Sequence, residues 1–381
     1  MIKVLQLIQY LSPGGAARAM LTVAKYSSRF DNNIIHRVAS YFPNPPDAGM
    51  VQLALNNGMT VVHTPGGDTL LKEIEQADII HINWWNNPEL NDFLHRELPP
   101  MRLLLWYHVG GDHAPQVITR QLIDLADFAV ACSPYTYERP VFQNLSKDEH
   151  QAKVRMVLAP ADFERLSGFQ PKPHNTFNIG YIGTVDFVKM HPNYVSMSAA
   201  VNIPQARFII CGGGSAIPIL QQQARQLGKI DQFDIRGYVN DIRPVIEVLD
   251  LYGYPLCEEN YAAAELNLQE VMYAGIPAIV FPYGGVSKLV VHNETGLIVH
   301  SEREYSEALE YLYYTPTERI RLGRNAAEYA RQHFGAENAV WKFNDLYTQM
   351  MRFPKHQRIW KYNSETHQTT IPRFKAVSCR F

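Results

Sequence analysis

Residues 258–285 read EENYAAAELNLQEVMYAGIPAIVFPYGG. The centre of this stretch predicts a helix that Gly275 and Pro277 end, followed by an apolar strand. A helix N-terminus presents N–H groups with partial positive charge, which suits a phosphate, and a nearby carboxylate can hold a sugar hydroxyl. The stretch therefore predicts either a site for a sugar phosphate or an ordinary βαβ edge whose glutamate faces solvent.

Short apolar runs alternate with helical patterns on both sides of this stretch. Most runs are too apolar for a strand with one wet face, which favours parallel sheets covered by helices on both sides. The pattern predicts an α/β protein with two doubly wound, Rossmann-like domains. The expected strands cover residues 4–8, 34–39, 60–63, 79–82, 103–106, 128–132, 178–182, 207–211, 233–236, 249–252, 278–281 and 296–299.

A stretch rich in proline and glycine, residues 159–178, breaks the alternation. It predicts an N-terminal domain over residues 1–165 and a C-terminal domain over 166–350. Ligands of doubly wound sheets bind beyond the carboxyl ends of the strands, so the two domains are expected to face a central cleft. The tail, residues 351–381, carries seven Lys or Arg against one acid, with interleaved aromatic residues. Packing on the N-terminal domain, contact with a membrane surface and partial disorder are all open for it.

The composition excludes several classes of protein. The 381 residues have a net charge of -2, and residues 1–165 carry 14 Lys or Arg against 17 acids, so a nucleic-acid partner is not expected. The four cysteines are far apart, which argues against a zinc or disulfide scaffold and fits a reducing, cytoplasmic compartment. No run of about 18 apolar residues predicts a membrane span, and the start reads as a strand rather than a signal peptide.

Glycine-rich turns follow several of the expected strands. Gly14 and Gly15 follow the first strand, Gly183 ends a later one, and Gly212 opens another turn. Small residues let a backbone approach a ligand closely, although many strand-to-helix loops need glycine for conformational reasons alone. The fingerprint GxGxxG is absent, which argues against a nicotinamide oxidoreductase.

Two single side chains also suit an anionic sugar ligand. His108 follows a strand, so it either points into the cleft or is an ordinary loop histidine. Lys189 can neutralise a phosphate as a point charge, or be a solvated surface lysine. Asp112 and His113 lack a third ligand at suitable spacing, so no metal site is expected.

The segment after the strand at 79–82 carries Trp84, Trp85 and Asn86. Aromatic faces stack on sugar rings, so these residues are candidates for binding a sugar. Burial of one tryptophan in the core is an equal alternative.

Taken in order, these motifs resemble those of the GT-B glycosyltransferases, and within them the retaining glycosyltransferase family 4. The resemblance covers about residues 1–350 and is strongest over 178–299. It rests on the Gly14–Gly15 loop, His108, the loop 183–189, the Gly212 turn, Glu270 in EVMYAGIP, Gly284–Gly285 and Glu294-Thr295-Gly296.

The resemblance implies transfer of a sugar, with retention, from a UDP-, GDP- or ADP-sugar to a hydroxyl of a glycan, lipid or small molecule. It implies no metal and no other cofactor. The implied catalytic residues are His108, Lys189, Glu265 and Glu270. The implied donor-binding residues are Gly14, Gly15, Gly183, Thr184, Lys189, Gly212, Tyr238, Val239, Leu266, Asn267 and Glu270, while Trp84, Trp85 and Asn86 are assigned to the acceptor.

The chain departs from the family pattern at several positions, and Lys189 lies about one residue earlier than the pattern places it. Ala262 stands where a glutamate usually precedes Glu270 by eight residues, and Glu265 stands where glycine is common. Thr184 replaces an arginine, and Lys288 replaces an acid. We expect an active enzyme with an altered donor site. Either Glu258, Glu259 or Glu265 contacts the sugar instead, or that contact is lost, and the missing cation is either absent or supplied by Arg18 or another residue. A degenerate GT-B binding module without turnover and a nucleotide-sugar epimerase are the alternatives. Peripheral contact with the inner membrane face and the oligomeric state stay open.

Overall fold

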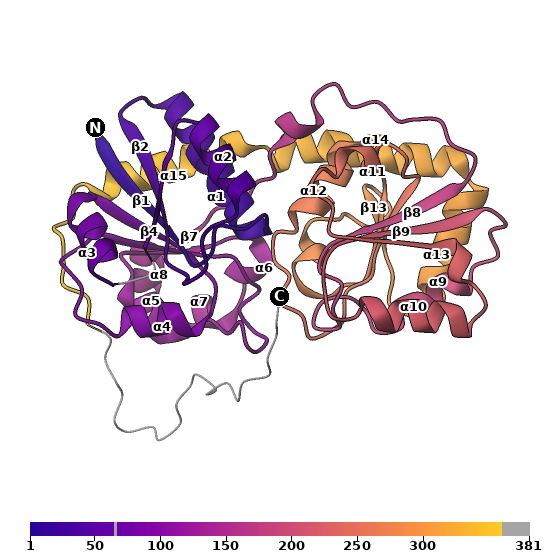
Figure 1. The fold of residues 1–381 in the computed structure, drawn as a ribbon, viewed down its shortest axis with the longest axis horizontal. Coiled ribbons are helices and arrows are strands. Elements are labelled where there is room, and N and C mark those ends of the chain that lie inside the picture. Colours follow the sequence, from indigo (N-terminus) through magenta and orange to yellow (C-terminus); the bar gives the residue numbers. More distant parts are fainter. Residues whose placement is uncertain (65–66, 360–381) are drawn as a thin grey trace, which may run out of the picture. The chain divides into compact units, whose positions relative to one another are not determined.

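The computed structural model describes residues 1–64 and 67–359, which form two compact units (Figure 1). Unit 1 comprises Met1–Pro160 and the chain from Ala336 onward, and unit 2 comprises Ala161–Gly335. Helix α15 (Ala336–Met350) thus belongs to unit 1, whereas the range 166–350 placed it in the second domain. Within the described ranges, no helix is long and apolar enough to cross a bilayer.

Unit 1 contains a parallel sheet with strand order β3-β2-β1-β4-β5-β6-β7. Its strands are β1 (Ile2–Ile8), β2 (Ile34–Ser40), β3 (Thr60–His63), β4 (Ile79–Trp84), β5 (Leu103–Tyr107), β6 (Phe128–Ala131) and β7 (Val154–Met156). Its helices are α1 (Gly15–Phe30), α2 (Ala48–Asn56), α3 (Gly67–Gln76), α4 (Pro88–Leu94), α5 (Arg120–Leu125), α6 (Pro134–Tyr137), α7 (Pro140–Gln143), α8 (Lys147–Lys153) and α15.

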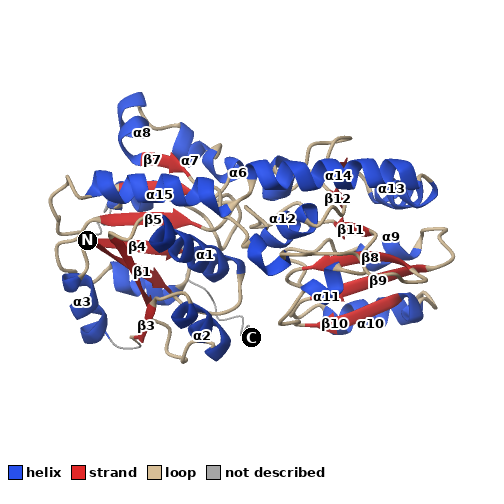
Figure 2. Cartoon of the chain, turned by 90° about the horizontal axis from the view of Figure 1, so that it is seen from above, coloured by secondary structure: helices blue, strands red, loops and turns tan. Residues whose placement is uncertain are grey.

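The two faces of this sheet differ in chemistry. Strand alternation sends Leu5, Ile82 and Leu105 to the face covered by α3, α4 and α5, where they form an apolar core. The opposite face packs against α1 and α15, which contact each other (Figure 2). Polar side chains of β1 and β4 lie buried on that second face.

The first part of the tail lies against unit 1. His356 pairs with Met101 through backbone hydrogen bonds in both directions, and the Phe353 ring packs 5.7 Å from the Phe128 ring. Arg358 forms an ion pair with Asp127. The rest of the tail, residues 360–381, lies outside the described residues, so the interpretations that concern it remain predictions.

Unit 2 contains a second parallel sheet, with strand order β10-β9-β8-β11-β12-β13 and helices on both sides (Figure 1). Its strands are β8 (Phe177–Ile182), β9 (Ala206–Cys211), β10 (Phe233–Gly237), β11 (Leu251–Tyr254), β12 (Ala278–Val280) and β13 (Gly296–Ile298). Its α-helices are α9 (Tyr194–Ala199), α10 (Ile217–Gln226), α11 (Arg243–Ile246), α12 (Leu266–Tyr273), α13 (Glu302–Tyr314) and α14 (Pro316–His333), with 3-10 turns at η1 (Phe163–Leu166), η2 (Ile230–Gln232) and η3 (Gly284–Lys288).

The prediction of two doubly wound α/β domains is confirmed. Every expected strand is present, with β11 displaced two residues toward the C-terminus. Strand β7 was missed because it has only three residues, with the charged Arg155 at its centre.

Candidate functional site

The candidate donor site of unit 2 lies where the strand order changes direction, between β8 and β11. Both strands are parallel, so their carboxyl ends meet at one edge of the sheet. The loop after β8 carries Lys189 to this edge, and the loop after β11 leads into α12. The edge therefore brings together two motifs that lie about 80 residues apart in the sequence.

Lys189 and Glu265 form a buried ion pair at this edge. The Lys189 Nζ atom lies 2.9 Å from Glu265 Oε2, and the side chains are 10% and 8% exposed. The Tyr254 hydroxyl donates a 2.5 Å hydrogen bond to the same carboxylate. The ammonium also lies 5.7 Å from the Tyr261 ring centroid and 5.9 Å from that of Tyr254, within range of a cation–π interaction.

The ion pair keeps Lys189 charged although it is buried. Burial alone would lower the pKa of Lys189, but the charge of Glu265, then Tyr261 and the hydrogen bond to Glu265, raise that pKa above its ordinary value. A charged ammonium is what a diphosphate ligand requires. In this structure the ammonium is balanced by a carboxylate of the same chain.

Glu265 immediately precedes α12 and has an unusual backbone conformation. Its φ is +26°, a region that favours glycine, and its side chain caps no helix N–H. Asn267, in the first turn, donates a 3.0 Å hydrogen bond to the carbonyl of Ile182 at the end of β8. Leu266 is buried. The start of α12 is thus held against β8 by Asn267. The Glu265 side chain does not cap the first N–H groups of α12.

Glu270 lies deeper in α12 and is fully buried. Its Oε1 atom lies 3.0 Å from Nη1 of Arg165, which is on η1 in the proline- and glycine-rich stretch 159–178. Two further contacts tie this segment to α12. The Ala161 N–H donates to Gln269 Oε1 at 3.0 Å, and the Phe163 ring stacks 4.2 Å from the Tyr273 ring. Sequence reasoning missed Arg165, because an isolated arginine in an irregular segment gives no signal.

The glycines at the ends of β8 and β9 allow two loops to pack backbone to backbone. A Cβ atom on Gly212 would lie 1.7 Å from the Gly183 carbonyl oxygen, and one on Gly214 would lie 2.0 Å from that of Val185. Gly212 and Gly214 also have φ values of +150° and +158°. Packing of the two loops therefore requires glycine at position 212, whether or not a ligand also approaches it.

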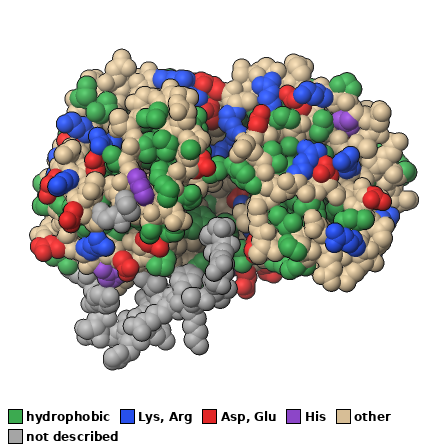
Figure 3. Space-filling model, in the orientation of Figure 1, with side chains coloured by type: hydrophobic (Ala, Val, Ile, Leu, Met, Phe, Trp, Pro, Cys, Tyr) green, Lys and Arg blue, Asp and Glu red, His purple; other side chains and the backbone are tan. Residues whose placement is uncertain are grey.

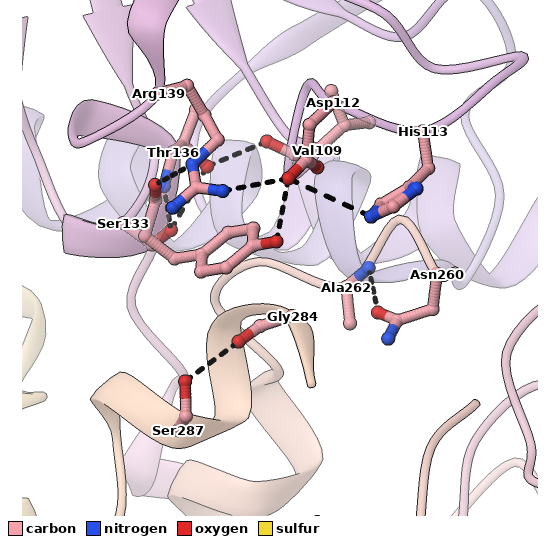
Figure 4. Close-up of polar contacts among 11 residues, drawn as sticks. Val109, Asp112, His113, Ser133, Thr136, Arg139, Asn260, Ala262, Gly284 and Ser287 are labelled. Carbon is pink, nitrogen blue, oxygen red and sulfur yellow. Dashed lines mark hydrogen bonds and ion pairs between the residues drawn. The ribbon is translucent and has the colours of Figure 1, made fainter. Parts of the chain in front are cut away.

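The turn at Gly284 and Gly285 packs against the loop that precedes α12. A Cβ atom on Gly285 would lie 1.7 Å from the Ala263 carbonyl oxygen, and the Gly285 N–H donates to the carbonyl of Ala262. Asn260 Oδ1 accepts from the Ala262 N–H at 2.8 Å (Figure 4). Ala262 is fully buried, so the position where the family usually has its first glutamate is filled by local packing.

Three other predicted donor-binding residues lie around the same sheet edge. The Thr184 hydroxyl lies 3.5 Å from the Tyr261 hydroxyl, and its carbonyl accepts from Tyr181. Tyr238 and Val239 follow β10, and the Tyr238 side chain is 55% exposed. These two residues are two strands away from β8, on the β9–β10 side of the sheet.

The candidate residues of unit 1 also lie at the carboxyl edge of its sheet. Gly14 and Gly15 are exposed at the start of α1, and a Cβ atom on Gly15 would meet nothing within 4 Å. His108 follows β5, and its Nε2 atom lies 3.1 Å from Asn83 Oδ1 of β4. Burial lowers the pKa of His108 to about 3, so the ring is neutral at physiological pH.

Trp84 is buried in the core, as the alternative for one of the two tryptophans expected, and the Asn86 side chain has partners within the chain. Strand β4 continues to Trp84, so alternation places this ring in the core on the same face as Ile82, with 1% of its surface exposed. The Asn86 amide donates to the Pro115 carbonyl at 2.5 Å and accepts from Asn91. Trp85 is only half-buried and packs at the edge of the core.

Asp112 forms a second polar cluster in unit 1 (Figure 4). Its Oδ2 atom accepts from the Tyr135 hydroxyl at 2.7 Å and from Arg139 at 2.8 Å, while His113 Nε2 lies 3.8 Å away. The Arg139 guanidinium lies 3.9 Å from the Tyr135 ring centroid. Asp112 is thus an ion-pair partner here. Over residues 1–64 and 67–359, no group of three or more His, Cys, Asp or Glu is suited to hold a metal ion.

The face of unit 1 seen in Figure 3 carries Lys and Arg side chains interspersed with Asp and Glu. This agrees with the near balance of charge counted in residues 1–165. Figure 3 shows no large patch of side chains of one charge among the described residues on this face.

Sequence reasoning also missed a buried polar network in unit 1, formed by Gln6, His36, His81, Asn83 and Tyr347. A signal was present: His81 and Asn83 alternate with isoleucines inside an otherwise apolar strand. Polar residues at alternate positions of a buried strand indicate a shared hydrogen-bonded face.

Comparisons with known proteins agree with this fold. Residues 162–329 match the family model described as "Glycosyl transferases group 1". The chain is 30% identical over 307 residues to the D-inositol 3-phosphate glycosyltransferase of Corynebacterium glutamicum, covering 71% of this chain and 72% of that protein.

Solved structures show the same architecture at low sequence identity. HepE of Anabaena, solved in complex with UDP-glucose, is similar with a TM-score of 0.73 and 17% identity, covering 92% of this chain and all of that one. Sucrose-phosphate synthase of Thermosynechococcus elongatus has a TM-score of 0.72 and 16% identity, with 92% and 100% covered. The chain therefore belongs to the glycosyl transferases group 1 family and has the GT-B fold.

Proposed function

We propose that this protein transfers a sugar from a nucleotide diphosphate donor to an acceptor hydroxyl, with retention of anomeric configuration. The observation that carries the proposal is the buried, charged Lys189 beside the start of α12, at the edge where β8 and β11 end. An ammonium and helix N–H groups together balance the charge that develops on a leaving diphosphate. Similarity to HepE, whose structure holds UDP-glucose, supports a nucleotide-sugar donor.

In the proposed reaction, the bond between the anomeric carbon and the diphosphate oxygen breaks. The acceptor oxygen then bonds to that carbon, and its proton leaves with the diphosphate. Glu270 is proposed to accept hydrogen bonds from the ribose, and His108 to contact the transferred sugar. No metal is required in this proposal, because Lys189 and α12 supply the positive charge.

A degenerate binding module is the second candidate, and one observation favours it. Both charged residues assigned to the donor have partners within the chain, since Lys189 pairs with Glu265 and Glu270 pairs with Arg165. A donor would have to compete with Glu265 for the ammonium. An active enzyme requires this exchange to be favourable, whereas a degenerate module does not.

A thermal-shift screen against UDP-, GDP- and ADP-sugars tests donor binding, because a ligand that binds only the folded state raises Tm. Product analysis by NMR then tests turnover. A retained anomeric linkage supports the proposal, free epimerised nucleotide sugar would indicate an epimerase, and binding without any product would indicate the degenerate module. Activity that survives a chelator would support metal independence.

Site variants test the assignment of residues. We expect Lys189→Ala and Glu270→Ala each to lower donor affinity or turnover at least about tenfold, as the loss of a charge-assisted contact predicts. Lys172→Ala is the matched control, because Lys172 forms an ion pair with Glu247 in the same unit but is 61% exposed and outside the site. Unchanged calorimetric binding and turnover in folded Lys189 or Glu270 variants would refute the assignment.

A further inference from the structure

A chain of buried hydrogen bonds runs across unit 1 and ends at His108. His108 Nε2 lies 3.1 Å from Asn83 Oδ1, and Asn83 Nδ2 donates to Gln6 Oε1 at 3.0 Å. Gln6 Nε2 in turn lies 3.3 Å from the hydroxyl of Tyr347 on α15. Asn83 and Gln6 are both almost fully buried, on neighbouring strands β4 and β1.

Two more histidines close the other end of the chain. Gln6 Nε2 lies 3.1 Å from His36 Nδ1 and 3.3 Å from His81 Nδ1. The Tyr347 hydroxyl lies 2.7 Å from the same His81 nitrogen. Burial lowers the pKa of His36 to about 3 and that of His81 well below its ordinary value, so both rings are neutral.

Two directions of hydrogen bonding are compatible with the distances along this chain. In one, each amide NH₂ points away from His108, so His108 must donate from Nε2. In the other, both amides are reversed, and His108 Nε2 must accept.

The carbonyl of Leu7 selects the first direction. It lies 3.5 Å from Asn83 Nδ2, and a backbone carbonyl can only accept. Reversing Asn83 would place its carbonyl oxygen against that of Leu7. The Asn83 oxygen therefore faces His108, and the ring must carry its proton on Nε2.

From this geometry we propose that Asn83 and Gln6 are positioning residues that hold His108 as the neutral Nε2–H tautomer. Its Nδ1 atom then acts only as an acceptor, suited to a sugar hydroxyl. The proposal rests on the proposed function in one respect, namely that the hydroxyl belongs to a sugar. A lone-pair acceptor repels a carboxylate, so this site favours a neutral hexose over the corresponding uronic acid.

The tautomer can be measured without any ligand. The full-length protein is labelled with ¹⁵N-histidine, and imidazole ¹H–¹⁵N correlation spectra are recorded from pH 5 to pH 8, with His108→Gln identifying the signals. We expect one Nε2–H tautomer that does not titrate in this range. An Nδ1–H tautomer, a mixture of both, or titration near the ordinary value of 6.5 would overturn the proposal.

Asn83→Asp tests the positioning role directly. A carboxylate facing Nε2–H stabilises the imidazolium, so the His108 signals should begin to titrate within the range measured. Asn178→Asp is the matched control, because Asn178 is an equally buried strand asparagine of unit 2 and should leave these signals unchanged. If Asn83→Asp folds and its His108 signals still do not titrate, the result counts against the proposal. If the variant does not fold, the wild-type spectrum alone decides between the tautomers.

Kinetics separate this proposal from the proposed function. In Asn83→Asp, kcat/KM for a nucleotide hexose should fall about three- to tenfold as pH drops through the new pKa, because a protonated Nδ1 cannot accept. The pH profile of kcat/KM for the wild-type protein should not show this fall. If His108 is the Nε2–H tautomer but no glycosyl transfer occurs, only the proposed function is refuted. If transfer occurs but His108 is the Nδ1–H tautomer, only the positioning role of Asn83 and Gln6 is refuted.

Discussion

Replacing Glu265 by glutamine tests whether the Lys189–Glu265 pair is buried and charged. Coulomb's law with an effective dielectric constant of about 20 gives about 6 kcal/mol for unit charges separated by the observed 2.9 Å. Desolvation of both groups offsets much of this attraction. Removing one partner leaves the other charge buried alone, so we expect Glu265→Gln to lower the free energy of unfolding of unit 2 by about 3–5 kcal/mol.

The assay can follow the two units separately. All five tryptophans (Trp84, Trp85, Trp106, Trp341 and Trp360) lie outside Ala161–Gly335, so tryptophan fluorescence reports on unit 1 and not on unit 2. Urea titrations followed by circular dichroism and fluorescence should show an earlier transition by dichroism in Glu265→Gln. The fluorescence transition should stay close to that of the wild-type protein.

Two comparisons make the result decisive. Glu307→Gln removes the partner of Arg303 in an exposed pair of the same unit, and it should leave the urea midpoint close to that of the wild-type protein. Lys189→Met combined with Glu265→Gln should recover part of the stability lost, because no charge is then left unpartnered. A loss below about 1 kcal/mol in Glu265→Gln would refute a buried, charged pair.

Three further predictions follow from the same contacts. Gly212→Ala should cost more than about 2 kcal/mol of unfolding free energy, whereas Gly213→Ala, where a Cβ would meet nothing within 4 Å, should be nearly neutral in urea titrations. Arg165→Met removes the guanidinium from Glu270 and should cost about 1.5–3 kcal/mol by the same measurement, and an unchanged midpoint would contradict the ion pair. The unfolded chain binds a proton at His36 near pH 6.5 and the folded chain only near pH 3, so stability should decline as pH falls between these values. The decline should be shallower in His36→Leu, as measured by urea midpoints of tryptophan fluorescence at pH 7, 5 and 4.

The arrangement of strands and helices could be predicted from the sequence because parallel, doubly covered strands are continuously apolar. Helix α15 could not be assigned to a unit in the same way. Its amphipathic pattern shows that it packs on something, but only tertiary contacts show that Tyr347 and Phe343 pack in unit 1.

The candidate site was predictable in its positions but not in its partners. Loop and helix-start positions such as Lys189 follow from strand ends, whereas its pairing with Glu265 joins residues 76 positions apart and leaves no local trace. The expected strand at 79–82 ended two residues before Trp84, whereas β4 continues through it. Because side chains alternate, that difference decides whether the ring faces the core or a loop.

A crystal structure of the protein soaked with a nucleotide diphosphate sugar would show whether Lys189 and α12 hold the diphosphate. We expect the diphosphate to lie within hydrogen-bonding distance of Lys189 Nζ and of the first N–H groups of α12, with Glu265 displaced from the ammonium. Diphosphate density elsewhere, with the Lys189–Glu265 pair intact, would contradict it.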